Sequence, residues 1–223
     1  MNIPTYLTLN HYRKLQNVTE LKSPSDLVDV TQLITGEDRD KILDLPKEEI
    51  DELVKQIFDL FTDSQPKFWP VFEFEGVEYG FTPPSKMTLG EWIDVESYSK
   101  NWQDDLASMM AVLYRPITKH NWNNPAWVTK YNIKLLQDKD TSAFDIYDVE
   151  KYDTETHKQR SKSFQNLPIE VALGAMAFFL TLNLKYAENS VISSLKNQSD
   201  QQEVTTQTNK MISLLFHSTM AGS

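Results

Sequence analysis

The stretch that decides the fold is Met87-Thr-Leu-Gly-Glu-Trp-Ile-Asp-Val-Glu96, followed after a polar joint by Leu106-Ala-Ser-Met-Met-Ala-Val-Leu-Tyr-Arg-Pro-Ile117. Thr88 and Glu91 have the spacing of a capping box, in which each side chain accepts a hydrogen bond from the other residue's backbone N–H. The second segment is densely apolar and ends at Pro116, which cannot continue a helix. The two segments therefore predict consecutive helices packed in a core.

The composition is that of a folded domain. The chain has 223 residues, of which 40% are hydrophobic and 11% aromatic, so it can bury a substantial core. It contains no cysteine, which excludes a disulfide scaffold, a thiolate zinc site and a cysteine nucleophile. The length favours one domain, or one and a half.

The charge is unevenly distributed along the chain. Residues 1–112 hold 21 acidic and 10 basic side chains, a net charge of −11, whereas residues 113–223 have a net charge of +1. An acidic half repels phosphate backbones, so we expect no nucleic-acid binding and favour a basic protein surface as partner. Solubility alone is the alternative explanation of this charge.

No membrane span or secretory signal is expected. The longest apolar run, Val171–Leu182, is shorter than the roughly 20 residues that cross a bilayer. The first five residues lack the basic start and apolar core of a signal peptide.

Helical spacing predicts four helices before the centre of the chain. Ser23 is a good cap for one of them, and Gly36 supplies its stop. The clearest helix is Pro46–Phe61, with one apolar stripe. The stripe consists of Ile50, Leu53, Val54, Ile57 and Phe61. The other helices are expected at 8–16, 23–36 and 37–44.

One β-hairpin is expected. Residues 71–74 and 77–81 alternate in polarity on either side of Glu75-Gly76, which is a turn signal. This is the only predicted strand pair. Residues 118–140 have a poor pattern and are loop-like at 121–125, 146–164 are helical in their second part, and Ile169–Leu195 is the most apolar helix.

The C-terminal region changes composition sharply. In Lys196–Asn209 the only large aliphatic residue is Val204, which is typical of a linker. This linker is followed by a short apolar segment, Met211–Phe216, here called the apolar island. The predicted fold is mainly α: a helical domain of residues 1–195 with one small hairpin near 71–81, a polar linker at 196–209 and a flexible apolar arm at 210–223. Docking of the island on the domain's own core is an open alternative to partner binding. The candidate partner-binding residues are Met211, Ile212, Leu214, Leu215 and Phe216.

Candidate catalytic and metal-binding residues lack the required spacing. The loop at Asp138–Ser142 starts like a calcium-binding loop, but Ala143 and Val149 stand where Gly and Glu are needed. Neighbouring carboxylates on a helix diverge by about 100°, so Glu48-Glu49 and Asp104-Asp105 do not converge on one site. The four histidines are His11, His120, His157 and His217. They are too far apart in the sequence to form a local metal-binding pair on one helix. We therefore expect no catalytic residue, no cofactor and no metal.

Three methionines have two interpretations. Met109, Met110 and Met176 could line an adaptable binding groove, because methionine repacks easily. Their large apolar neighbours favour a place in the core.

Three segments occur in a characteristic order: Leu33–Pro46, then Lys86–Val95 with Asp105–Pro116, then Leu167–Phe179. Together, over roughly residues 6–190, they resemble small tailed-phage morphogenesis proteins, which include tail-assembly chaperones and tail or baseplate components. The resemblance implies a protein without catalytic residues that binds other phage tail or connector proteins, and that can also bind copies of itself. It implies a place in the host cytoplasm during assembly, or in the virion.

The function expected from this resemblance is that of a tail-assembly chaperone, which would shield apolar tape-measure helices until the tail polymerises. The first alternative is a structural component of a head-to-tail or baseplate ring, which would be found in purified virions. The alternative outside this class is a carboxylate-based, metal-dependent hydrolase, which titration with divalent metals would reveal.

Overall fold

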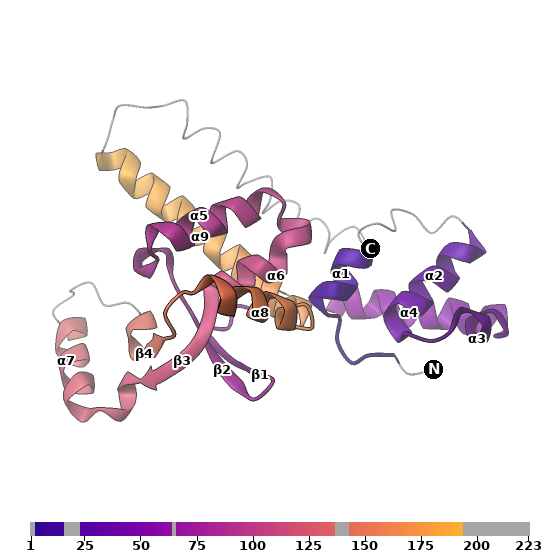
Figure 1. The fold of residues 1–223 in the computed structure, drawn as a ribbon, viewed down its shortest axis with the longest axis horizontal. Coiled ribbons are helices and arrows are strands. Elements are labelled where there is room, and N and C mark those ends of the chain that lie inside the picture. The colour runs from indigo at the N-terminus through magenta and orange to yellow at the C-terminus, as the bar shows by residue number, and fades with distance from the viewer. Residues whose placement is uncertain (1–2, 16–22, 64–65, 137–142, 194–223) are drawn as a thin grey trace. The chain divides into compact units, whose positions relative to one another are not determined.

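The computed structural model describes residues 3–15, 23–63, 66–136 and 143–193 (Figure 1). The fold is mainly helical, as predicted. The chain divides into two compact units. Unit 1 consists of the described residues up to Phe68 and from Gln165 onwards, and unit 2 is Trp69–Phe164. Unit 2 is therefore one continuous segment inserted into unit 1.

Unit 1 contains α1 (Leu9–Leu15), α2 (Pro24–Thr35), α3 (Arg39–Leu43), α4 (Lys47–Asp63) and α9 (Ile169–Ser193). The predicted start of α2 is confirmed: Ser23 and Asp26 form a capping box, and Gly36 ends the helix in the left-handed conformation with φ of 68°. Helix α2 packs against α3 and α4 around a small core. This core contains Val28, Ile42, Ile50 and Val54.

The predicted stripe of α4 is only partly correct. Ile50, Val54 and Ile57 are buried, but Leu53 is half-buried. Leu53 lies at the border of the stripe, where a helical position is shared between core and solvent. The side chain of Phe61 lies outside the described residues.

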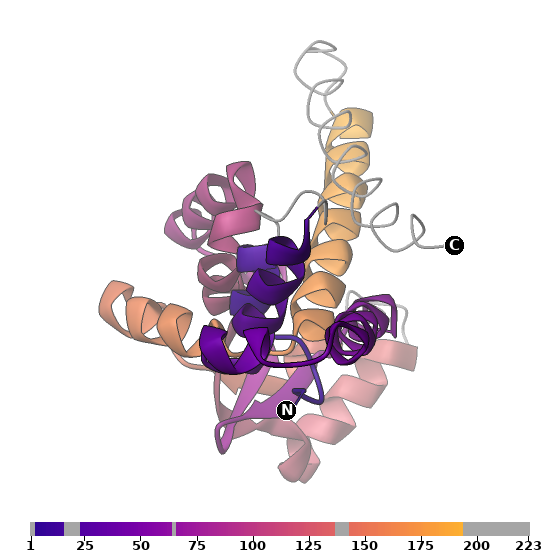
Figure 2. The same ribbon diagram turned by 90° about the vertical axis from the view of Figure 1, so that its right-hand side faces the viewer.

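Helix α9 is one continuous helix (Figure 2) and is apolar nearly all round in its first half, as predicted. Its N-terminus is joined to that of α1, because Leu9 donates to Leu167 O at 3.0 Å. Gly174 permits a second close approach: a Cβ there would lie 2.2 Å from the backbone of Lys67. The Lys67 N–H donates to Glu170 O at 3.3 Å, so this segment is held directly on α9.

Unit 2 contains a four-stranded antiparallel sheet in the order β1-β2-β3-β4. The strands are β1 (Val71–Phe74), β2 (Val77–Phe81), β3 (Tyr114–His120) and β4 (Tyr147–Val149). Its helices are α5 (Leu89–Lys100), α6 (Trp102–Leu113), α7 (Pro125–Leu136) and α8 (Thr154–Phe164), and α6 packs against both α5 and α8. Three short 3-10 turns are η1 (Pro84–Lys86), η2 (Asn121–Asn123) and η3 (Ala143–Ile146).

The predicted hairpin is confirmed as β1 and β2. Glu75 and Gly76 have φ of 51° and 74°, which is the pair of left-handed residues of a type I′ turn. One face of the hairpin packs on aromatic side chains. The aromatic cluster comprises Phe72, Tyr79, Tyr114 and Phe164, with ring centroids of contacting pairs 4.8–6.2 Å apart.

The prediction of a single strand pair is wrong, because β3 and β4 extend the hairpin. The poor pattern of residues 118–140 did not predict α7, which begins at Pro125, the last residue of the loop-like stretch 121–125. That helix begins after Asn124, whose Oδ1 accepts hydrogen bonds from Ala126 N at 3.1 Å and Trp127 N at 3.3 Å. Asn followed by Pro125 is a cap with proline in the first turn, a signal that could have revealed α7.

Candidate functional site

A buried ion pair fixes α5 to β3 within unit 2. Arg115 Nη1 lies 2.6 Å from Glu91 Oε1, and the two side chains are 7% and 2% exposed. The second terminal nitrogen of Arg115 donates to Thr82 Oγ1 at 3.1 Å. Burial lowers the pKa of Arg115, and the Glu91 carboxylate opposes that shift. The pair stabilises the position of α5 against β3.

A second set of buried polar contacts holds α8. Arg160 lies 2.6 Å from Glu150 Oε2 and donates to Ala111 O at 2.9 Å. The Tyr152 hydroxyl donates a hydrogen bond to Asp94. Burial is the main cause that raises the pKa of Tyr152, and this hydrogen bond is the second. These groups are satisfied by one another, so they position α5, α6 and α8.

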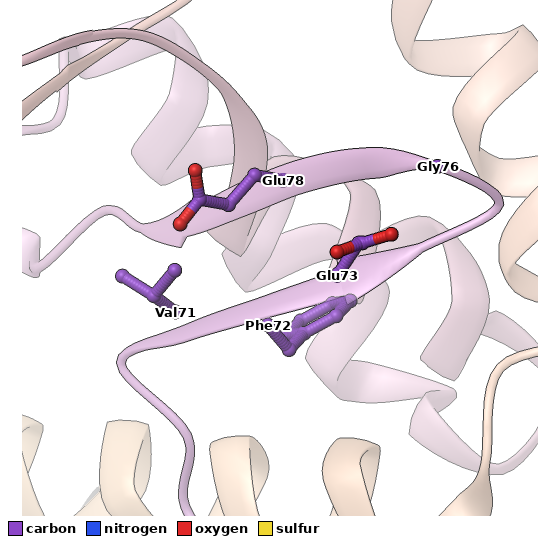
Figure 3. A pocket seen from close by; sticks show the side chains of 5 residues that line it. All are labelled: Val71, Phe72, Glu73, Gly76 and Glu78. Carbon is purple, nitrogen blue, oxygen red and sulfur yellow. The ribbon is translucent and has the colours of Figure 1, made fainter.

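An open, acidic hollow lies along the hairpin (Figure 3). It has a volume of about 460 Å³ and is lined by Val71, Phe72, Glu73, Gly76 and Glu78. Glu73 and Glu78 are exposed and stand directly opposite each other on β1 and β2. Like charges in opposed positions of two strands destabilise the pair. The hollow therefore has the chemistry to receive a cationic group.

One lining residue of the hollow, Glu78, contacts a histidine that packs on an exposed aromatic side chain. His120 Nε2 lies 2.7 Å from Glu78 Oε2, and the His120 ring packs on Trp122 with centroids 4.2 Å apart. Trp122 is 43% exposed. A carboxylate in contact with an imidazole can orient it for acid/base chemistry, and here Glu78 is exposed to solvent. Among the described residues, no group of three or more His, Asp or Glu could hold a metal ion.

An apolar face is exposed on α5, here called the α5 face. It consists of Leu89, which is 76% exposed, and Ile93, which is 53% exposed. They are four residues apart and therefore adjacent on the helix surface. Gly90 beside them has no side chain, and a Cβ added there would touch nothing within 4 Å. The α5 face is therefore apolar and exposed.

The structure separates the candidates singled out in the sequence. His157 is buried against Ser108 O, His11 is half-buried and caps α1, and His120 contacts Glu78, which lines the hollow. Glu48, Glu49 and Asp104 are exposed, and Asp105 is half-buried. The methionines Met109, Met110 and Met176 are fully buried, which confirms the core interpretation.

The predicted arm lies outside the described residues. This applies to the linker 196–209 and to the candidate partner-binding residues. Those residues are Met211, Ile212, Leu214, Leu215 and Phe216. The loop at Asp138–Ser142 and His217 also lie outside the described parts, whereas Ala143 and Val149 do not. The acidic hollow and the α5 face were not predicted as sites, although the helical spacing of Leu89 and Ile93 is readable in the sequence.

Across the described ranges, no helix has both the length and the apolar character needed to cross a membrane. Comparison with protein-family models, with curated proteins and with solved structures finds no match for this chain.

Proposed function

We propose that this chain is a non-enzymatic morphogenesis protein of a tailed phage, which acts by binding other proteins in the manner of a tail-assembly chaperone. The observation that carries the proposal is the α5 face, where Leu89 and Ile93 are exposed side by side. Burying an aliphatic side chain of this size contributes about 1.5–3 kcal/mol, so the face gains free energy when a partner covers it.

The α5 face is presented on a rigid support. Thr88 and Glu91 cap the helix directly beneath Leu89, and Glu91 is also held by Arg115. A surface that is already ordered loses little conformational entropy on binding, which favours association. An apolar helix of a tape-measure protein is a partner of the right chemistry, because it needs cover before the tail polymerises.

The assignment to a phage rests on the resemblance of the segments around Leu33–Pro46, Lys86–Pro116 and Leu167–Phe179 to tail morphogenesis proteins. The acidic surface agrees with a role among protein partners rather than on nucleic acid.

The test is co-expression of the chain with the tape-measure protein of the same phage. The wild-type chain should keep the tape-measure protein soluble and co-elute with it, whereas the double variant Leu89→Ser, Ile93→Ser should not. Leu43→Ser is the matched control, because Leu43 on α3 is 57% exposed, close to the 53% of Ile93. If the double variant keeps the tape-measure protein soluble as well as the wild-type chain does, the role of the α5 face is overturned. Stoichiometric presence of the chain in purified virions would favour the structural-component alternative.

A further inference from the structure

We propose that β1 is a docking edge for a basic, extended segment of another protein, which adds a strand to the sheet beside Glu73. This proposal extends the proposed protein-binding function to a second surface and uses none of the residues of the α5 face.

The register of the hairpin determines which backbone groups of β1 are free. Phe74 and Val77 flank the two-residue turn and form the closing hydrogen-bonded pair, so Phe72 and Tyr79 form the next one. The bond from Phe81 N to Pro70 O, at 2.9 Å, continues the same alternation. The backbone N–H and C=O groups of Val71 and Glu73 therefore point away from β2.

Strand β1 lies at the edge of the sheet, with β2 as its neighbour. Among the described residues, the N–H groups of Val71 and Glu73 donate to no backbone carbonyl. Such an edge is a template for another strand, as in proteins that bind extended peptides by strand addition. The open hollow over the hairpin is lined by Val71, Phe72 and Glu73 of β1 together with Gly76 and Glu78, so β1 has space beside it for incoming side chains.

The charges at the edge of β1 determine which kind of segment can bind there. Glu73 faces Glu78 across the hairpin, and both carboxylates are exposed (Figure 3). A lysine or arginine on the incoming strand next to Glu73 would relieve this repulsion, because opposite charges on neighbouring strands attract. A second copy of this chain would instead bring its own Glu73 to the edge and add a third carboxylate. The charge pattern therefore favours a basic segment of a different protein.

The experiment uses a fluorescently labelled peptide of alternating lysine and valine, and its counterpart of alternating glutamate and valine, titrated into the full chain at low salt. The basic peptide should bind and the acidic one should not. Glu73→Lys should weaken binding of the basic peptide by about tenfold, since an attraction is replaced by a repulsion. Asp59→Lys on α4 makes the same change in net charge at an exposed site and should leave the affinity unchanged.

A second arm separates strand pairing from general charge attraction. The same basic peptide, N-methylated on the alternate amides that would face β1, keeps its charge but loses its donors and should not bind. Val71→Pro removes an outward N–H without interrupting the ladder to β2, and should also weaken binding. Unchanged binding of the methylated peptide would overturn strand addition. Absence of binding by the unmodified peptide would mean that Glu73 only protects the edge from aggregation. The double variant Leu89→Ser, Ile93→Ser should bind the peptide as the wild type does. A failure of the β1 proposal can therefore be distinguished from a failure of the proposed function of the α5 face.

Discussion

Glu91 Oε1 lies 2.6 Å from Arg115 Nη1, and through this buried contact the first turn of α5 is fixed to β3. Its other oxygen, Oε2, accepts a hydrogen bond from Thr88 N at 2.5 Å and so caps the same helix. One carboxylate therefore holds both the start of the helix and the strand behind it.

Glu91→Gln should destabilise unit 2 severely. Glutamine retains an oxygen for Thr88 N, but the guanidinium of Arg115 is left buried without a counter-charge. Removing one partner of a buried ion pair costs about 3–5 kcal/mol. Urea denaturation followed by circular dichroism gives the change in free energy of unfolding.

The double variant Glu91→Gln, Arg115→Met provides the control. It removes both charges together, so its cost should be clearly smaller than the sum of the two single changes. Additive costs would show that the two side chains do not interact.

Thr88→Ala should lower the free energy of unfolding by about 1 kcal/mol, because Glu91 N loses the Thr88 Oγ1 acceptor at 3.3 Å. Thr88→Ser retains the hydroxyl and should remain within a few tenths of a kcal/mol of the wild type. The comparison of the two melting temperatures checks the cap. A neutral alanine variant would mean that α5 starts at a different residue.

Ile57→Ala should cost about 2–5 kcal/mol, since Ile57 is fully buried on α4 and its truncation leaves a cavity. Leu53→Ala should cost less, because Leu53 is half-buried. Chemical denaturation of both variants checks the ranking. If Leu53→Ala proves the more damaging change, the core face of α4 is rotated from the one described.

Stability should fall in mild acid through His11. Its Nδ1 accepts a hydrogen bond from Thr8 N at 3.3 Å, which only the neutral ring can do. The pKa of His11 lies below its ordinary value of 6.5, mainly because the ring is partly buried and, to a smaller extent, because Lys14 is positively charged. The contribution of the neutral ring is thus complete above about pH 6.5 and is lost as the pH falls through the lower, folded-state value.

The matched variant for this effect is His11→Gln, which can still accept from Thr8 N but does not titrate. The difference in melting temperature between the wild type and this variant should change between pH 7 and pH 5. A constant difference would show that His11 does not contribute to the acid sensitivity.

Truncation after Lys196 should leave the melting temperature unchanged and weaken association with a partner or a second copy. The expectation comes from composition: residues 197–209 have too little apolar area to offset ordering costs of about 1–2 kcal/mol per residue. Thermal melting and light-scattering mass are the two measurements. Unfolding of the truncated chain would place Met211–Phe216 in the core.

The helices could be predicted where caps and spacing agree locally. Ser23 with Asp26, and Thr88 with Glu91, form the predicted reciprocal bonds. Gly36 adopts the left-handed conformation of a helix stop. These features depend on residues three or four positions apart, so the sequence contains the necessary information.

Strand β3 could not be predicted, because its burial depends on a distant partner. A polarity pattern predicts that a charged residue such as Arg115 is exposed to solvent. Arg115 is nevertheless buried, because it forms an ion pair with Glu91, 24 positions away in the sequence. Pro116 further hides the strand, since it lacks an N–H for the ladder. The opposition of Glu73 and Glu78, by contrast, already follows from the predicted two-residue turn at Glu75-Gly76, which fixes the register of the hairpin.

Unit 2 leaves unit 1 after Phe68 and returns at Gln165. On the unit 1 side, Lys67 bonds to Glu170 and Gln165 O accepts from Asn10, so both ends are tied near the start of α9. On the unit 2 side, the rings of Phe72 and Phe164 lie 6.2 Å apart. A segment whose two ends lie together can be removed or exchanged without opening the host fold. Residues 69–164 thus form a cassette, and recombination could replace the surfaces of α5 and β1 as one block while the packing of unit 1 stays intact.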